Sequence, residues 1–107
     1  SKACVGCALI SQTGAVYSGC NVENASFGLT ICAERNAIFA GVRAEGPIFR
    51  IARLAVIAVG LEFPPCGACR QVIAEFSAAD VPVIFIQDGK PVSRTISALL
   101  PDGFRFL

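Results

Sequence analysis

Two short cysteine motifs in this chain have the residue types and the spacing of a metal site. Cys32-Ala33-Glu34 places a thiol two residues before a carboxylate, and residues 65–69 (Pro-Cys-Gly-Ala-Cys) contain the pair Cys66 and Cys69. Both motifs stand where a helix is predicted to begin, and free backbone N–H groups and the helix dipole favour thiolates there. Thiolates bind zinc at about 2.3 Å. Because the chain contains no histidine, a transition-metal site must use cysteine and carboxylate.

The number of ligands predicts a catalytic rather than a structural zinc. Structural sites are closed by four protein ligands, whereas catalytic sites have three and keep one position for water. Here Cys32, Cys66 and Cys69 make three ligands, and Glu34 lies beside one of them. Zinc lowers the pKa of such a water toward about 7, so Glu34 can take its proton and return it to a substrate nitrogen. Alone, Glu34 would be an ordinary glutamate in the first turn of a helix.

An arginine follows each motif and is a candidate for balancing charge. Three thiolates on one Zn²⁺ leave a net negative charge, so a nearby positive group is expected. Arg35 and Arg70 each directly follow a motif residue. We expect Arg35, more than Arg70, to donate hydrogen bonds to ligand sulfurs, while Arg70 can equally be a surface ion-pair residue.

Neither a disulfide framework nor a redox pair accounts for the whole cysteine pattern. A disulfide framework is typical of loop-rich secreted scaffolds with small cores, and this chain is 54% hydrophobic. A thioredoxin-like C-x-x-C would explain Cys66 and Cys69 but neither Cys32 nor Glu34. The remaining cysteines lie in apolar, alternating stretches and are interpreted as core residues: Cys4, Cys7 and Cys20.

Hydrophobic patterning predicts a chain of alternating strands and helices. The expected strands are residues 5–11, 15–20, 54–59, 81–86 and 91–95, and the expected helices are residues 32–42, 67–76 and 97–100. Gln12-Thr13-Gly14 and Asp88-Gly89 are turn signals, and residues 21–30 are predicted to form a loop of defined shape. Ser97 is the expected N-cap of the last helix. Helices that alternate with buried strands predict an α/β fold with a mixed sheet flanked by helices.

Composition excludes several functional classes. A chain of 107 residues is expected to form one domain. Its net charge of +1 argues against binding long nucleic acid, which needs a basic surface, and favours a small neutral ligand. No apolar run approaches the roughly 20 residues that span a bilayer, and no signal peptide is recognisable, so a cytoplasmic location is expected. With 16% charged residues, we favour an oligomer over a compact monomer.

Taken together, the motifs resemble those of the small, homotetrameric, zinc-dependent cytidine deaminases. A His or Cys, then x-Glu, with a later Pro-Cys-x-x-Cys, is the signature of zinc deaminases. The likeness runs from Val5 nearly to the C-terminus, and four segments occur in the family's order: residues 21–26 (Asn-Val-Glu-Asn-Ala-Ser), 32–35 (Cys-Ala-Glu-Arg), 65–71 (Pro-Cys-Gly-Ala-Cys-Arg-Gln) and 99–101 (Leu-Leu-Pro). Residues 1–107 would then be one cytidine deaminase domain with a three-layer α/β/α fold and a mixed five-stranded sheet.

The resemblance implies an activity and a set of substrate contacts. It implies a hydrolase that converts cytidine and deoxycytidine to uridine and deoxyuridine in pyrimidine salvage, with one Zn²⁺ per chain. Asn21 and Glu23 would hold the ribose hydroxyls, and Ala33 would contact the base through its backbone. Phe27 would lie near the pyrimidine, and Phe104 would reach the site of a neighbouring subunit. Without the resemblance, Asn21 and Glu23 are equally typical of a turn. Phe27 and Phe104 are then more typical of core residues than of ligand contacts.

The chain departs from the family pattern in three places. Ala3 stands where the family usually has a phenylalanine against the substrate, the family's N-terminal helix is absent from residues 1–107, and the loop between Val59 and Pro65 is about two residues short. Three alternatives therefore stay open: a deaminase of another cytosine nucleoside such as blasticidin S, a non-catalytic zinc protein that binds a partner, and a nucleic-acid editing deaminase. We expect a small-molecule nucleoside substrate, with no nucleic acid and no membrane partner.

Overall fold

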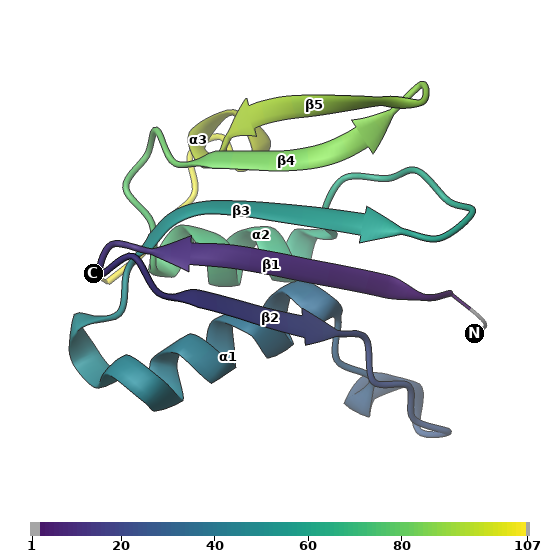
Figure 1. Cartoon of the computed structure of the whole chain (residues 1–107), viewed down its shortest axis with the longest axis horizontal. Helices are drawn as coiled ribbons and strands as arrows, with labels where there is room; N and C mark the ends of the chain where they lie inside the picture. Colours follow the sequence, from purple (N-terminus) through teal and green to yellow (C-terminus); the bar gives the residue numbers. More distant parts are fainter. Residues whose placement is uncertain (1–2, 107) are drawn as a thin grey trace.

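A computed structural model describes residues 3–106 and shows one mixed five-stranded sheet, in the order β2-β1-β3-β4-β5 (Figure 1). The strands are β1 (Val5–Ser11), β2 (Val16–Cys20), β3 (Ile51–Ala58), β4 (Pro82–Gln87) and β5 (Lys90–Thr95). The helices are α1 (Ala33–Glu45), α2 (Gly67–Glu75) and α3 (Ile96–Leu99), with short 3-10 turns η1 (Phe27–Leu29) and η2 (Gly46–Ile48). Within residues 3–106, no helix has the length and apolarity needed to cross a membrane.

The pairing of the strands explains why the sheet is mixed. β1 runs antiparallel to both β2 and β3, and β4 runs antiparallel to β5. β3 and β4 are parallel, and parallel neighbours need a crossover connection, which α2 provides. The predicted mixed five-stranded sheet flanked by helices is confirmed.

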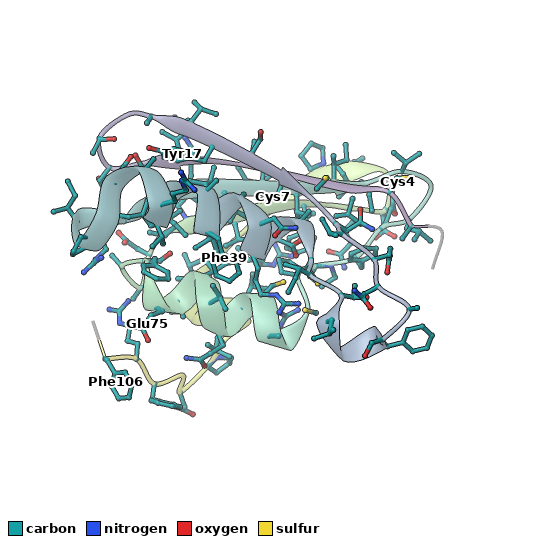
Figure 2. All side chains as sticks on the ribbon, turned by 90° about the horizontal axis from the view of Figure 1, so that it is seen from below. Cys4, Cys7, Tyr17, Phe39, Glu75 and Phe106 are labelled. Carbon is teal, nitrogen blue, oxygen red and sulfur yellow. The ribbon has the colours of Figure 1, made fainter. Side chains whose placement is uncertain are left out.

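The long helices lie side by side on one face of the sheet, as Figure 2 shows from below. α1 packs on β1 and β2 and also touches α2, while α3 packs against α2 and β5. The described residues thus supply one of the two predicted helical layers. On the opposite face of the sheet, Figure 2 shows no helix from residues 3–106. The alternating burial of the strands places small and apolar side chains on that face: Ala8, Ile10, Ala55, Ile57 and Ile84.

Most element boundaries differ from the prediction by a residue or more, and the largest differences are at β3 and α1. β3 begins at Ile51, three residues before the predicted start. The prediction started after Arg53 because this charged residue interrupts the apolar run, but the strand includes it with its side chain exposed. α1 continues to Glu45. The prediction of Ser97 as the last N-cap is wrong, since the side chain of Thr95 accepts the hydrogen bond from the Ala98 N–H at 3.2 Å.

A carboxylate fastens the far end of α1 to the β1–β2 hairpin. Glu45 Oε2 accepts hydrogen bonds from the hydroxyls of Ser11 at 2.7 Å, Thr13 at 2.9 Å and Tyr17 at 2.8 Å. Figure 2 shows Tyr17 on the hairpin above α1. These hydrogen bonds hold the pKa of the Glu45 carboxyl below its ordinary value, and the bond from Ser11 contributes most. The helix is therefore held at the end opposite its cysteine.

At its other end, α1 lies directly against a glycine of β2. A Cβ built on Gly19 would lie 2.5 Å from the backbone nitrogen of Ala37 and 2.6 Å from the carbonyl oxygen of Ala33. Both partners are helix backbone, which cannot move aside without shifting the helix. This close approach sets the height above the sheet of the first turn of α1, which contains Glu34.

The contact predicts a measurable cost for a single methyl group. Gly19→Ala should lower the free energy of unfolding by about 1–3 kcal/mol, the usual cost of overpacking a tight contact. Gly6→Ala on the neighbouring strand β1 is the matched control, since nothing lies within 4 Å of its added Cβ. Urea unfolding of both variants measures the difference. Equal stability of the two would contradict the close packing of β2 against α1.

Candidate metal centre and substrate cleft

The N-termini of α1 and α2 bring three cysteines together. Cys32 is the N-cap of α1, Cys66 is the N-cap of α2, and Cys69 lies in the first turn of α2. Their sulfurs all lie within 4.8 Å of one another, and the Cys32 and Cys66 sulfurs are 3.9 Å apart. Both N-cap residues have extended backbone, and their sulfurs meet between the two helix starts.

The three sulfurs fit a zinc ion in spacing and in chemistry. Ligands placed about 2.3 Å from one ion at tetrahedral angles are separated by about 3.8 Å. The observed distance between the Cys32 and Cys66 sulfurs, 3.9 Å, matches this edge. Soft thiolate donors select zinc over hard cations such as Mg²⁺. The centre is partly open to solvent, because Cys69 is buried whereas Cys66 is exposed.

A half-buried arginine lies beside the sulfurs. Arg35 Nη2 donates a hydrogen bond to the sulfur of Cys32 at 3.4 Å, and its Nε is buried with no acceptor among the described residues. Contact with Cys32, and then with Cys69, raises the pKa of the guanidinium, although burial acts in the other direction. Arg70 instead donates to the carbonyl oxygens of Pro65 at 2.7 Å and Leu99 at 2.9 Å, so it ties the cysteine loop to α3.

The thiols of α2 differ in their ease of ionisation. Burial opposes ionisation of Cys66, but the N–H groups of Cys69 and Ala68 at the start of the helix lower the pKa of its thiol. Burial raises the pKa of the Cys69 thiol, and the nearby Glu34 carboxylate raises it further. The local field is therefore negative around a buried sulfur, which is an arrangement that a bound cation stabilises.

Glu34 is buried in the first turn of α1, with 2% of its surface exposed. Its carboxylate acts on sulfurs from two elements: Cys69 of α2, and Cys7 of β1, whose pKa rises to about 12 through burial first and Glu34 second. Glu34 therefore lies between the sheet and the cysteine cluster. A carboxylate so placed can move protons to a group bound beside the sulfurs.

A cleft of about 200 Å³ opens above these residues. Pockets for drug-sized ligands run from roughly 300 to 1,000 Å³, so this one suits a small molecule. Its lining consists of Ala3, Val5, Asn21, Glu23, Thr30, Cys32, Ala33, Glu34, Phe63, Pro64 and Cys66. A second cavity of similar volume lies between α2, α3 and residues 102–105, and neither cysteine nor glutamate lines it.

A hydrogen-bonded pair forms the polar rim of the cleft. Asn21 Oδ1 accepts from the Val5 N–H at 3.0 Å, and its Nδ2 donates to the Ala3 carbonyl at 2.8 Å and to Glu23 Oε1 at 3.1 Å. Asn21 thus fixes residues 3–5 along the rim and orients Glu23. The structure brings both residues, with Ala33, into the cleft that contains Glu34.

Comparison with known proteins identifies the family. Residues 1–85 match the family model described as the cytidine and deoxycytidylate deaminase zinc-binding region. The chain belongs to this family. A cytidine deaminase of Sporosarcina psychrophila is 45% identical over 97% of this chain and 76% of its own length. A cytidine deaminase of Halalkalibacterium halodurans is 46% identical over 94% of this chain and 76% of its own length. The crystal structure of cytidine deaminase from Burkholderia pseudomallei superposes with a TM-score of 0.85 at 40% identity, covering 96% of this chain and 83% of that one. The predicted family, fold and enzyme class are thereby confirmed.

Two expected substrate contacts do not lie in the cleft of this cytidine deaminase family member. Phe27 is 85% exposed on the η1 turn, where Gly28 follows it, and it does not line the cleft. Phe104 is 72% exposed; its backbone carbonyl accepts a hydrogen bond from Gln71 Nε2 of α2 at 2.8 Å, and it lines the second cavity instead of the cleft. Figure 2 shows the same segment, ending near Phe106, beyond α2 and away from the sheet.

Two further outcomes concern residues at the edges of the site. The interpretation of Cys4 and Cys20 as core residues is wrong, since both are exposed, whereas Cys7 is buried. Thr30, Phe63 and Pro64 line the cleft without having been predicted. Their signal in the sequence is weak: Phe63 directly precedes Pro64-Pro65-Cys66, which places an aromatic ring on the loop that ends at a ligand.

Loss of one sulfur should abolish metal binding. Cys66→Ser should reduce zinc from about one ion per chain to a small fraction, because a neutral hydroxyl is a much poorer zinc ligand than a thiolate. Cys20→Ser, at an exposed cysteine outside the cluster, is the matched control and should retain its zinc. Elemental analysis after dialysis measures both. Full zinc content in Cys66→Ser would exclude this ligand set.

Proposed function

We propose that this chain is a zinc-dependent hydrolase that deaminates cytidine and deoxycytidine to uridine and deoxyuridine, with release of ammonia. The observation that carries the proposal is the buried Glu34 in one cleft with the cysteine sulfurs, opposite the polar rim of Asn21 and Glu23. The similar proteins that are named cytidine deaminases support the substrate class.

In this proposal Cys32, Cys66 and Cys69 hold the metal. When bound, the zinc ion supplies Lewis acidity that makes water a nucleophile near neutral pH. Glu34 takes a proton from the attacking water and gives a proton to N3 of the base as C4 is attacked. It then carries the second proton to the amine on C4, so that the C–N bond breaks, ammonia leaves and a carbonyl oxygen remains on C4.

The other predicted residues bind and orient the substrate. Asn21 and Glu23 hold the ribose hydroxyls, for which an amide and a carboxylate are suitable hydrogen-bond partners. Ala33, fully buried at the start of α1, offers its backbone to the base. Arg35 donates to the Cys32 sulfur and offsets part of the negative charge of three thiolates, so that the ion stays a strong Lewis acid.

The predicted homotetramer with shared active sites belongs to the same proposal. Phe104 and Phe106 are 72% and 91% exposed, and Phe27 is 85% exposed. The rings of Phe104 and Phe106 are in contact, with their centroids 6.1 Å apart, and exposed apolar side chains that lie together are typical of protein interfaces. In an assembly, Phe104 would reach the site of a neighbouring subunit, and Phe27 would lie near a bound pyrimidine. The proposed setting is pyrimidine salvage in the cytoplasm.

A second candidate is the deamination of another cytosine nucleoside, such as blasticidin S. Ala3 favours this candidate, because its small side chain lines the cleft and leaves space for a substrate with a bulkier group. Parallel assays with cytidine, deoxycytidine and blasticidin S decide between the candidates.

The role of Glu34 is tested by a variant that keeps its shape. Glu34→Gln should lower kcat for cytidine by about 10²–10⁴-fold, because an amide cannot shuttle the protons, while zinc content stays unchanged. Loss of absorbance during deamination measures the rate, and Asp80→Asn, at an exposed carboxylate, is the control. Near-normal turnover by Glu34→Gln would refute the assigned role.

A further inference from the structure

We propose that Phe63 is the aromatic wall against which the pyrimidine base stacks, and that it sets a preference for flat bases over puckered ones. The inference rests on the proposed function and assigns a specificity-determining residue to the same cleft. Among the described residues that line the cleft, Phe63 is the aromatic one, and it is 39% exposed.

The positions of the polar groups determine where a base must lie. C4 of the base has to reach Glu34 and the sulfurs, while the sugar has to reach Asn21 and Glu23. The pyrimidine ring, which lies between these two ends, must therefore contact the apolar part of the lining. That part is made of Ala3, Val5, Phe63 and Pro64. Of these four, the side chain of Phe63 alone has a π face, and stacked rings are attracted beyond what burial of area gives.

The loop that carries Phe63 is held on both sides of the ring. Glu62 Oε2 accepts a hydrogen bond from the Gly89 N–H at 2.8 Å, which ties the loop to the β4–β5 turn. Pro64 follows, and a residue before proline is restricted to extended backbone. Further along, Pro65 is buried and precedes the ligand Cys66. Because the loop is constrained before the substrate arrives, stacking on Phe63 costs little additional ordering.

The small residue at position 3 makes this arrangement workable. Ala3 lines the same cleft, and its carbonyl is held by Asn21 Nδ2 at 2.8 Å, so a methyl group and not a ring faces the cavity from the N-terminal segment. A base can therefore lie against the loop before Cys66. In the family pattern the ring stands at position 3. In this chain the aromatic group in the cleft is instead Phe63, on the loop that precedes Cys66.

The test compares two ligands that differ in the planarity of the base. Uridine is flat, whereas 5,6-dihydrouridine has the same sugar and the same carbonyl groups on a puckered ring. Inhibition constants of both are measured against cytidine turnover by the zinc-loaded wild type. Phe63→Leu and Phe63→Met keep an apolar side chain without a ring, and Phe63→Tyr restores the ring. Phe39→Leu, at an exposed phenylalanine of α1 outside the cleft, is the matched control.

The proposal predicts that the wild type binds uridine more tightly than dihydrouridine. Phe63→Leu and Phe63→Met should weaken uridine by about 2- to 12-fold and leave dihydrouridine nearly unchanged. Phe63→Tyr and Phe39→Leu should keep the wild-type ratio, and all variants should retain zinc. An unchanged ratio in both the Leu and Met variants of an active enzyme overturns the role of Phe63 alone. A zinc-loaded wild type that neither deaminates cytidine nor binds uridine overturns the proposed function as well.

Discussion

The convergence of three sulfurs on the N-termini of two neighbouring helices is the constraint on which the rest of the structure depends. Cys69 is buried, Cys32 is half-buried, and the buried carboxylate of Glu34 lies beside them. Ionised thiols and a carboxylate repel one another in a medium of low dielectric, so the group requires positive charge. Arg35 and the helix N-termini supply part of that charge, and a divalent cation would supply the remainder.

The architecture serves this convergence. The parallel pair β3 and β4 requires a crossover, and that crossover is α2, which carries two of the three cysteines. α1 carries Glu34 and is held at both ends, by Gly19 against its first turns and by Glu45 in the hydrogen bonds of the hairpin. Sulfurs from different elements thus meet within 4.8 Å because their helices are fixed on a common sheet face.

The features of this molecule that short sequence motifs determine were predicted, whereas those that depend on contacts between distant residues were not. Cys-x-Glu and Pro-Cys-x-x-Cys each encode a helix start, so the helices, the family and the cysteine cluster follow from a few residues. The N-cap of α3 was missed because Thr95 and Ser97 are equally suitable by type. The direction of a loop side chain depends on partners far along the chain: Phe63 is positioned by the bond between Glu62 and Gly89, 27 residues apart. Phe27 and Phe104 are of a residue type that usually lies in a core, yet both are exposed, and nothing local in the sequence distinguishes an exposed phenylalanine from a buried one.

The most direct test of the account is the zinc dependence of cytidine turnover by the purified protein. Metal content and the loss of absorbance with cytidine are measured before zinc is removed with a chelator, after its removal, and after zinc is added back. The account predicts about one zinc per chain, turnover that disappears with the metal, and recovery in proportion to the zinc restored. A fully zinc-loaded protein that leaves cytidine unchanged, or turnover that persists without metal, would contradict it.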